Sequence, residues 1–390
     1  MKRHESAERI ICVNDNYSQR VSIKDSERML RQANKQVANI FIKADKQFPN
    51  SMEFNNILVK SENKNRLQAF LKSQLQKTAH VVTTEIIHVV VGESAENLTK
   101  QTQEDDFLCT HCEADTAIFT IYNDIRGSGY LEPVIIDTED TDNYVQAAYV
   151  ANKVNGILLL KQKNRLIDAK CLIDSDMTDC IVPLHAITGC DHTSGFYGIG
   201  KIKVTKRVKK STDVRKLLSA VGENIMITDD YIQKLTKFVT KYIYSDYKSK
   251  TIAEARPSSW KQQKRKSLIR MIPDMDSLIH HIKRANYIAY IQKNFSFKDH
   301  PSPLDKGWHM ENGVCLPTRS RLPSLPPSVT MAMPYLRYAH TVHEHDDDNI
   351  SYEDSEEFPY VASDEEDVYI YSDDDSILSD ASTSYRDDIS

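Results

Sequence analysis

Carboxylate side chains gather in three short segments of this 390-residue sequence, each beside a run of apolar residues. The segments are Glu113-Ala114-Asp115, Asp140-Thr141-Asp142 and Gly189-Cys190-Asp191. Hard oxygen ligands of this kind suit Mg²⁺ or Mn²⁺. One or two such ions can activate a water and stabilise the leaving oxygen of a phosphodiester. The acids therefore predict a divalent-metal site, although any one segment alone is also typical of an acid that caps a helix.

The elements that must position these acids indicate an α/β fold. Apolar, β-branched runs predict strands at 9–15, 132–140 and 156–162, and a hairpin or pair of strands at 80–94. Apolar residues at helical spacing predict helices at 23–48, 61–75 and 113–126. They also predict a helix that ends at the turn of residues 189–191. Alternating strands and helices favour a largely parallel sheet, in which chemistry gathers at the carboxyl ends of the strands. Asp15 and the acids of 137–142 both follow such ends.

The second half of the chain differs in composition. Eight of the sixteen residues from Lys201 to Lys216 are basic. Helical patterns follow at 213–248 and up to about 295, with a basic stretch at 261–270, and a proline-rich segment after 301 lacks periodicity. Beyond 340 the residues are mostly Asp, Glu, Ser and Tyr, which predicts disorder. We therefore expect a nuclease-like domain at 1–205, a basic helical extension at 206–300, an extended segment at 301–340 and a disordered acidic tail at 341–390.

The charge is divided between the body and the tail. Residues 344–390 carry 18 Asp and Glu against one Arg, or −17, which leaves +11 for residues 1–343. A basic body with an acidic tail recurs in nucleic-acid proteins, and the alternative is a solvated surface with a solubilising tail. No apolar run reaches about 18 residues, and the N-terminus lacks the apolar core of a secretory signal. We expect an intracellular, nuclear protein that binds nucleic acid, with DNA favoured, and no membrane.

Taken in order, the acidic segments resemble the PIN-like domain of flap endonucleases. The motifs are HCEADTAIF (111–119), DTEDTDNYV (137–145) and VPLHAITGCDHTSGFYGIGK (182–201). The last motif is similar to a transposon-associated, largely uncharacterised invertebrate branch, as are VNDNYSQRVSIKDSERMLR (13–31) and GWHMENGVCLPTRSRLPSLPPSV (307–329). The similarity runs, with gaps, from about residue 9 to about residue 330. It implies a PIN-like three-layer sandwich with a mainly parallel sheet.

The resemblance also implies roles for individual residues. Lys24 and Arg28 fall where basic residues meet the scissile phosphate. The implied metal-binding acids are Asp15, Glu113, Asp115, Asp140, Asp142 and Asp191. Gly198, Gly200 and Lys201 resemble a hairpin that grips duplex backbone, since glycines permit close phosphate approach and lysines add counter-charge. The further nucleic-acid-binding residues expected there are Lys203, Lys206, Arg207, Lys209 and Lys210.

The sequence departs from the family pattern at several places. The family's first strand, which bears a metal-binding Asp, is expected to be missing here. Cys112 replaces an acid, and Asn143 stands where an apolar strand residue is expected. Cys109 and Cys112 have zinc-like spacing but no partner pair. Cys190 is expected to be a buried small side chain rather than a nucleophile.

These observations leave three hypotheses. The first is a metal-dependent, structure-specific nuclease, in an intact or a degenerate form. The second is a catalytically inactive, transposon-derived protein that binds nucleic acid without cutting it. The third is a non-functional fragment that folds poorly, or folds only with a partner that supplies the absent strand.

Overall fold

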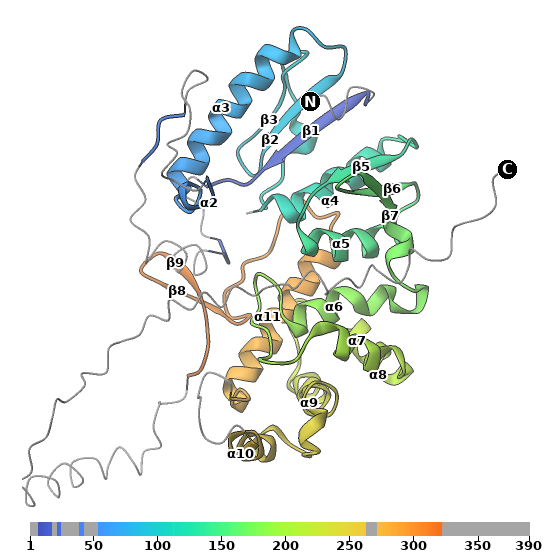
Figure 1. The fold of residues 1–390 in the computed structure, drawn as a ribbon, viewed down its shortest axis with the longest axis vertical. Helices are drawn as coiled ribbons and strands as arrows, with labels where there is room; N and C mark the ends of the chain where they lie inside the picture. The colour runs from blue at the N-terminus through green and yellow to red at the C-terminus, as the bar shows by residue number, and fades with distance from the viewer. Residues whose placement is uncertain are drawn as a thin grey trace, which may run out of the picture. The chain divides into compact units, whose positions relative to one another are not determined.

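The computed structural model describes residues 7–17, 22–24, 39–42, 54–111, 113–262 and 271–321 (Figure 1). The described residues up to Arg319 belong to one compact unit. Arg28, Cys112, most of the helix expected at 23–48 and the expected acidic tail lie outside the described residues.

The first sheet has four strands in the order β1-β2-β3-β4. Strand β1 (Arg9–Asn14) runs parallel to β2 (Glu85–Val90), and β3 (Ser94–Asn97) and β4 (Thr102–Gln103) follow as antiparallel neighbours. Two adjacent isoleucines of β2 point to opposite faces, as the twofold period of a strand requires. Ile86 packs with Ala79 from α3 (Ser61–Ala79), and Ile87 packs with Ile121 from α4 (Ala114–Gly127). A four-residue helix, α2 (Phe54–Ile57), precedes α3.

The second sheet has three strands in the order β5-β6-β7. Strand β5 (Val134–Asp137) pairs in parallel with β6 (Leu158–Gln162), which pairs antiparallel with β7 (Arg165–Asp168). The crossover between β5 and β6 contains α5 (Thr141–Ala151). Ile136, Leu158 and Leu160 lie in the main hydrophobic core, so one face of this sheet is covered by helices.

The rest of the described chain is mainly helical. Helix α6 (Thr178–Thr188) is almost wholly buried and packs against α5, α8 and α11. The other helices are α7 (Lys201–Lys209), α8 (Thr212–Ser219), α9 (Asp229–Phe238), α10 (Ile252–Gln262) and α11 (Met275–Lys293). Short 3₁₀ turns lie at Asp105–Phe107, Ala169–Leu172, Ser175–Met177 and Ser245–Tyr247, and one π turn lies at Val239–Ile243.

The helix expected over 213–248 is broken between α8 and α9. Gly222 lies in this break with φ +80°, a backbone conformation that disfavours side chains. A Cβ there would lie 2.6 Å from the backbone carbonyl carbon of Ala289 in α11. The close approach of α11 therefore requires glycine at this position and ends the helical run.

The segment after 301, expected to be extended, contains a hairpin of β8 (Trp308–Glu311) and β9 (Val314–Pro317). Trp308 and Cys315 are buried in the main core. Arg284 of α11 donates hydrogen bonds to the carbonyl oxygens of Gly307 and Thr318, which fixes both ends of the hairpin.

The expected mixture of helices and strands is confirmed. The arrangement of the sheets differs from the single, mainly parallel sheet that was predicted. The described residues form small mixed sheets, in which β1·β2 and β5·β6 are the parallel pairs. Among the described residues, no helix combines the length and apolar character that crossing a membrane requires.

Candidate metal centre

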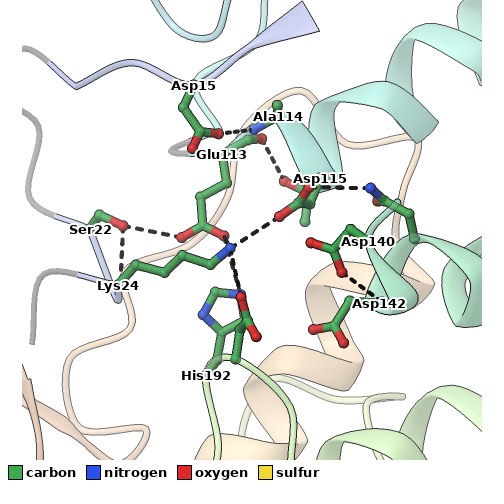
Figure 2. A network of polar contacts seen from close by, with 12 residues as sticks. Asp15, Ser22, Lys24, Glu113, Ala114, Asp115, Asp140, Asp142 and His192 are labelled. Atoms are coloured by element: carbon green, nitrogen blue, oxygen red, sulfur yellow. Dashed lines mark hydrogen bonds and ion pairs between the residues drawn. The ribbon is translucent and has the colours of Figure 1, made fainter. Parts of the chain in front are cut away.

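Carboxylates from distant parts of the sequence meet at the N-terminal ends of α4 and α5 (Figure 2). Glu113 and Asp115 lie at the start of α4, and Asp140 and Asp142 lie at the start of α5. Asp191 belongs to the turn after α6. Backbone N–H groups and the positive end of the helix dipole stabilise negative charge at helix N-termini. These helix N-termini offset part of the cost of bringing the acids together.

The ammonium group of Lys24 lies among three of these carboxylates. Its Nζ is 3.1 Å from Asp115 Oδ2, 3.3 Å from Glu113 Oε2 and 3.4 Å from Asp191 Oδ2. The Lys24 side chain is only 14% exposed. Burial alone would lower the pKa of Lys24, but the three carboxylates outweigh it and raise that pKa above its usual value. Lys24 is therefore charged at neutral pH and is the internal cation of the cluster in this structure.

Three neutral or basic side chains also contact Glu113 and Asp115. Ser22 Oγ donates to Glu113 Oε1 (3.2 Å) and accepts from the Lys24 backbone N–H (3.1 Å). His192 Nε2 lies 3.2 Å from Glu113 Oε2. Burial alone would lower the pKa of His192, but the charge and the hydrogen bond of Glu113 together outweigh burial and raise that pKa. Asn143 Nδ2 donates to Asp115 Oδ1 (3.3 Å) and to Thr138 Oγ1 (3.1 Å), which orients the Asp115 carboxylate.

The folded protein disfavours the ionised form of Asp140. Burial is the main reason that its pKa is raised to about 6, and the neighbouring charges of Asp115, Asp142 and Asp191 add to it. Burial likewise raises the pKa of Asp115, and Glu113 contributes in the same direction. Asp140 Oδ1 also accepts from the Asp142 backbone N–H (2.8 Å) and so caps α5. A bound cation would offset both the burial of these carboxylates and the smaller repulsion between them, as expected of carboxylates that bind a metal ion.

The turn after α6 delivers Asp191 and His192 to the cluster. Gly189 ends the helix with φ +114°, and a Cβ there would lie 2.6 Å from Gly195 Cα. Cys190 and Thr193 exchange backbone hydrogen bonds of 3.1 and 3.0 Å, and Thr193 Oγ1 donates to the Ala186 carbonyl (2.6 Å). The turn is therefore tight, and a larger residue at 189 would displace it.

A second polar group lies beside the first, around Asp142. His185 Nε2 is 2.8 Å from Asp142 Oδ1, and Lys201 Nζ is 3.2 Å from His185 Nδ1. Burial would raise the pKa of Asp142, but the hydrogen bond from His185 outweighs it and holds that pKa well below its usual range. Cys190 completes the group, and the ligand atoms of Asp142, His185 and Cys190 all lie within 4.8 Å of one another. These three side chains could hold a metal ion.

Cys190 is half-buried, and its thiol lies 3.2 Å from Thr193 Oγ1. Burial is the main cause that raises the pKa of Cys190 to about 11, and the charge of Asp142 adds to it. A thiol with a raised pKa is protonated at neutral pH, and so is a poor nucleophile without a metal. The expected burial of Cys190 is only partial, and its lack of a nucleophilic role stays a prediction that the raised pKa supports.

Asp15 follows β1 and contacts the same helix end as the other acids. Its Oδ1 accepts from the backbone N–H of Ala114 (2.7 Å), one of the N–H groups that the first turn of α4 leaves without an intrahelical partner. This hydrogen bond alone accounts for an acid at position 15, whereas its role as a metal ligand stays a prediction.

We expect Asp15→Ala to lower the free energy of unfolding by about 1 kcal/mol, the usual cost of losing a side-chain cap. Urea denaturation of the metal-free protein measures this cost. Asp15→Asn keeps an oxygen acceptor and should restore most of the loss. A loss of Mg²⁺ binding in Asp15→Asn at unchanged stability would instead assign Asp15 to the metal set.

The predicted nucleic-acid residues divide into two groups. Lys206 and Lys210 are exposed, and none of the described ion pairs includes them. The others have internal or surface partners: Lys201 contacts His185, Lys203 and Arg207 contact Asp246, and Lys209 contacts Asp174.

Gly198 has φ +71° with open space around it, and Gly200 precedes the first residue of α7. The backbone of this turn is accessible for close approach by another molecule.

The structure brings together five of the six predicted metal ligands with Lys24, and it places Asp15 against α4 beside them. The sequence patterns gave no role to Ser22, Asn143, His185 and His192. Asn143 lies in helix α5 rather than in a strand, with a buried amide that contacts Asp115. His185 and His192 lie near Asp191 in sequence, but the acids that they contact are 43 and 79 residues away, so no local pattern could have paired them.

Comparisons with protein-family models, with curated proteins and with solved structures found no match for this chain.

Proposed function

We propose that this chain carries a PIN-like domain of the flap-endonuclease type that hydrolyses phosphodiester bonds in nucleic acid with Mg²⁺ or Mn²⁺. The observation that supports this most strongly is the meeting of Glu113, Asp115 and Asp191 around one buried cation, with Asp140 and Asp142 beside them. Hard oxygen donors at two helix N-termini fit one or two such ions. The metal chemistry at such a site is activation of water and stabilisation of the leaving oxygen.

The chain's own residues would bind and orient the substrate around that site. With the carboxylates holding a divalent ion, Lys24 would be free to neutralise a phosphate oxygen, which is the role that the family resemblance implies for it. His192 is held by Glu113 and lies beside the same acids. Asn143 keeps the Asp115 carboxylate in one orientation. These interactions would pre-organise the acids before substrate arrives.

Helix α7 is proposed to bind the phosphate backbone beside the cluster. We expect the double variant Lys206→Glu/Lys210→Glu to weaken DNA binding and to reduce the slope of log affinity against log salt by about 1 for each phosphate that the protein no longer neutralises. Fluorescence anisotropy at several salt concentrations measures the affinity for DNA and its dependence on salt. Lys234→Glu/Lys237→Glu on α9 is the matched control, because both lysines are exposed and the change of charge is the same. Equal effects of the two changes would exclude a specific role for α7.

The second candidate is a protein that binds nucleic acid without cutting it, of transposon origin. It is favoured by one observation, the position of the Lys24 ammonium at the centre of the carboxylates. An internal cation that cannot be displaced would neutralise the acids permanently and leave no divalent-metal site.

Cleavage of labelled single-stranded, duplex and 5′-flap DNA with Mg²⁺ or Mn²⁺ separates the two candidates. The nuclease proposal expects cleavage by the wild type that falls on the order of a hundredfold or more in Asp191→Asn. Asp230→Asn, an exposed acid that pairs with Lys234 on α9, is the control and should cut normally. A folded wild type that binds DNA in the anisotropy assay and cuts none of these substrates would support the second candidate.

A further inference from the structure

We propose that Asp142, His185 and Cys190 form a site for a transition-metal ion of the zinc class, separate from the Mg²⁺ ligands around Lys24. Magnesium would stay with Glu113, Asp115, Asp140 and Asp191, and the ion that Asp142 binds would be of a different chemical kind. The site stands on these three side chains alone, so it holds whether or not the protein cuts phosphodiesters.

The three donors come from elements that the fold holds rigidly. Asp142 lies in the first turn of α5, His185 lies in α6, and Cys190 lies in the tight turn that Gly189 begins. Asp142 and His185 are 8% and 6% exposed. Zinc lies about 2.0–2.3 Å from its ligand atoms, which places those atoms roughly 3–4 Å apart. Ligand atoms that all lie within 4.8 Å of one another therefore need only small side-chain adjustments to hold one ion.

The donor types identify the class of metal. Thiolate sulfur and imidazole nitrogen suit Zn²⁺ and related ions such as Co²⁺, whereas Mg²⁺ takes oxygen ligands. Three protein ligands leave one position open in a tetrahedral ion, as in catalytic rather than structural zinc sites. A phosphate oxygen or a water could take that position.

Lys201 is the group that competes with the ion. An ammonium can only donate, so Lys201 donates to His185 Nδ1, and His185 Nε2 in turn donates to Asp142. Metal binding through Nε2 moves the imidazole proton from Nε2 to Nδ1 and releases the thiol proton of Cys190 to solvent. Nδ1 then no longer accepts a hydrogen bond, and the Lys201 ammonium must turn away.

Titration of the full chain with Co²⁺, without DNA or Mg²⁺, tests the proposal directly. A thiolate ligand gives a sulfur-to-cobalt charge-transfer band, and tetrahedral geometry gives intense visible bands. We expect both bands in the wild type, with displacement by Zn²⁺ and not by Mg²⁺. Cys190→Ser should lose the charge-transfer band and bind Co²⁺ at least about tenfold more weakly. Cys171→Ser, which changes an exposed cysteine, should match the wild type.

Two further variants keep the test decisive if Cys190→Ser fails to fold. His185→Gln should weaken Co²⁺ binding while it leaves the thiolate in place. Lys201→Met should tighten Co²⁺ binding by roughly tenfold, because it removes a competing charge. No charge-transfer band in the wild type would overturn the proposal. A band that persists in folded Cys190→Ser would also overturn it, because another cysteine would then be the ligand. Cleavage with Mg²⁺ is scored separately, so failure of the nuclease proposal cannot be mistaken for failure of this one.

Discussion

Replacement of Asp140 by Asn is expected to stabilise the metal-free protein and to abolish its further stabilisation by Mg²⁺. Burial and the charges of neighbouring acids raise the pKa of Asp140 to about 6 from its ordinary value of 3.8. The folded state therefore binds more protons than the unfolded state between about pH 4 and pH 6, and stability falls as pH rises through that window. Above pH 6 the full cost of the charge is present. Asn removes the charge and keeps an oxygen that can cap α5 through the Asp142 N–H.

The expected gain is on the order of 1 kcal/mol at pH 7.5 after allowance for partial exposure, or roughly 2–4 °C in melting temperature. Thermal unfolding in EDTA measures the gain in stability of the metal-free protein, and thermal unfolding in Mg²⁺ measures the further stabilisation by the ion. In the wild type, stabilisation by Mg²⁺ should grow as pH rises through about 6, because the ion binds the ionised carboxylate. Asp137→Asn is the control, since Asp137 ends β5 and pairs with Lys161 (3.3 Å) outside the cluster. An Asp140→Asn protein that still gains stability from Mg²⁺ would remove Asp140 from the metal set.

Replacement of Lys24 by Met is expected to have opposite effects on stability and on metal affinity. Without metal, Met leaves Glu113, Asp115 and Asp191 with no central cation, and loss of one partner of a buried ion pair costs about 3 kcal/mol. In Mg²⁺ the same variant should bind the ion at least about tenfold more tightly than the wild type, because no ammonium must first be displaced. Chemical denaturation in EDTA and isothermal titration with Mg²⁺ measure the two effects.

Lys72→Met is the matched control for Lys24→Met. Lys72 forms one ion pair with Glu96 at 2.6 Å, and both side chains are about a quarter exposed. A pair of this kind contributes less than about 1 kcal/mol, and its loss should leave Mg²⁺ binding unchanged. If Lys24→Met lost stability without any gain in Mg²⁺ affinity, Lys24 would be a structural cation, and the non-cutting candidate function would be favoured.

Local sequence patterns predicted the elements that carry the acids, because periodicity and turn chemistry act over a few residues. The helix expected at 113–126 is α4 (Ala114–Gly127), and the strand expected at 9–15 is β1 (Arg9–Asn14). The turn at 189–191 ends α6 as expected. The acids were predicted to gather at the carboxyl ends of parallel strands, whereas Glu113, Asp115, Asp140 and Asp142 lie at the N-terminal ends of two helices, which favour negative charge.

Interactions between distant segments account for what the sequence did not reveal. Lys24 reaches carboxylates 89 and 91 residues away, and the Asp142–His185 hydrogen bond joins α5 to α6. Gly222 lies where α11 approaches the break in a predicted helix, and the β8–β9 hairpin is held by Arg284 and a buried Trp308. No local pattern encodes these arrangements, since each requires two surfaces that meet only in the folded chain.

The most direct test of the metal centre is a crystal structure of the wild-type protein grown with Mn²⁺, with anomalous scattering measured to locate the ion. The proposed function predicts one or two anomalous peaks among Glu113, Asp115, Asp140 and Asp191, with the Lys24 ammonium displaced from its present position between Glu113, Asp115 and Asp191. A map that lacks any peak among these acids, with Lys24 still within hydrogen-bonding distance of all three, would contradict it.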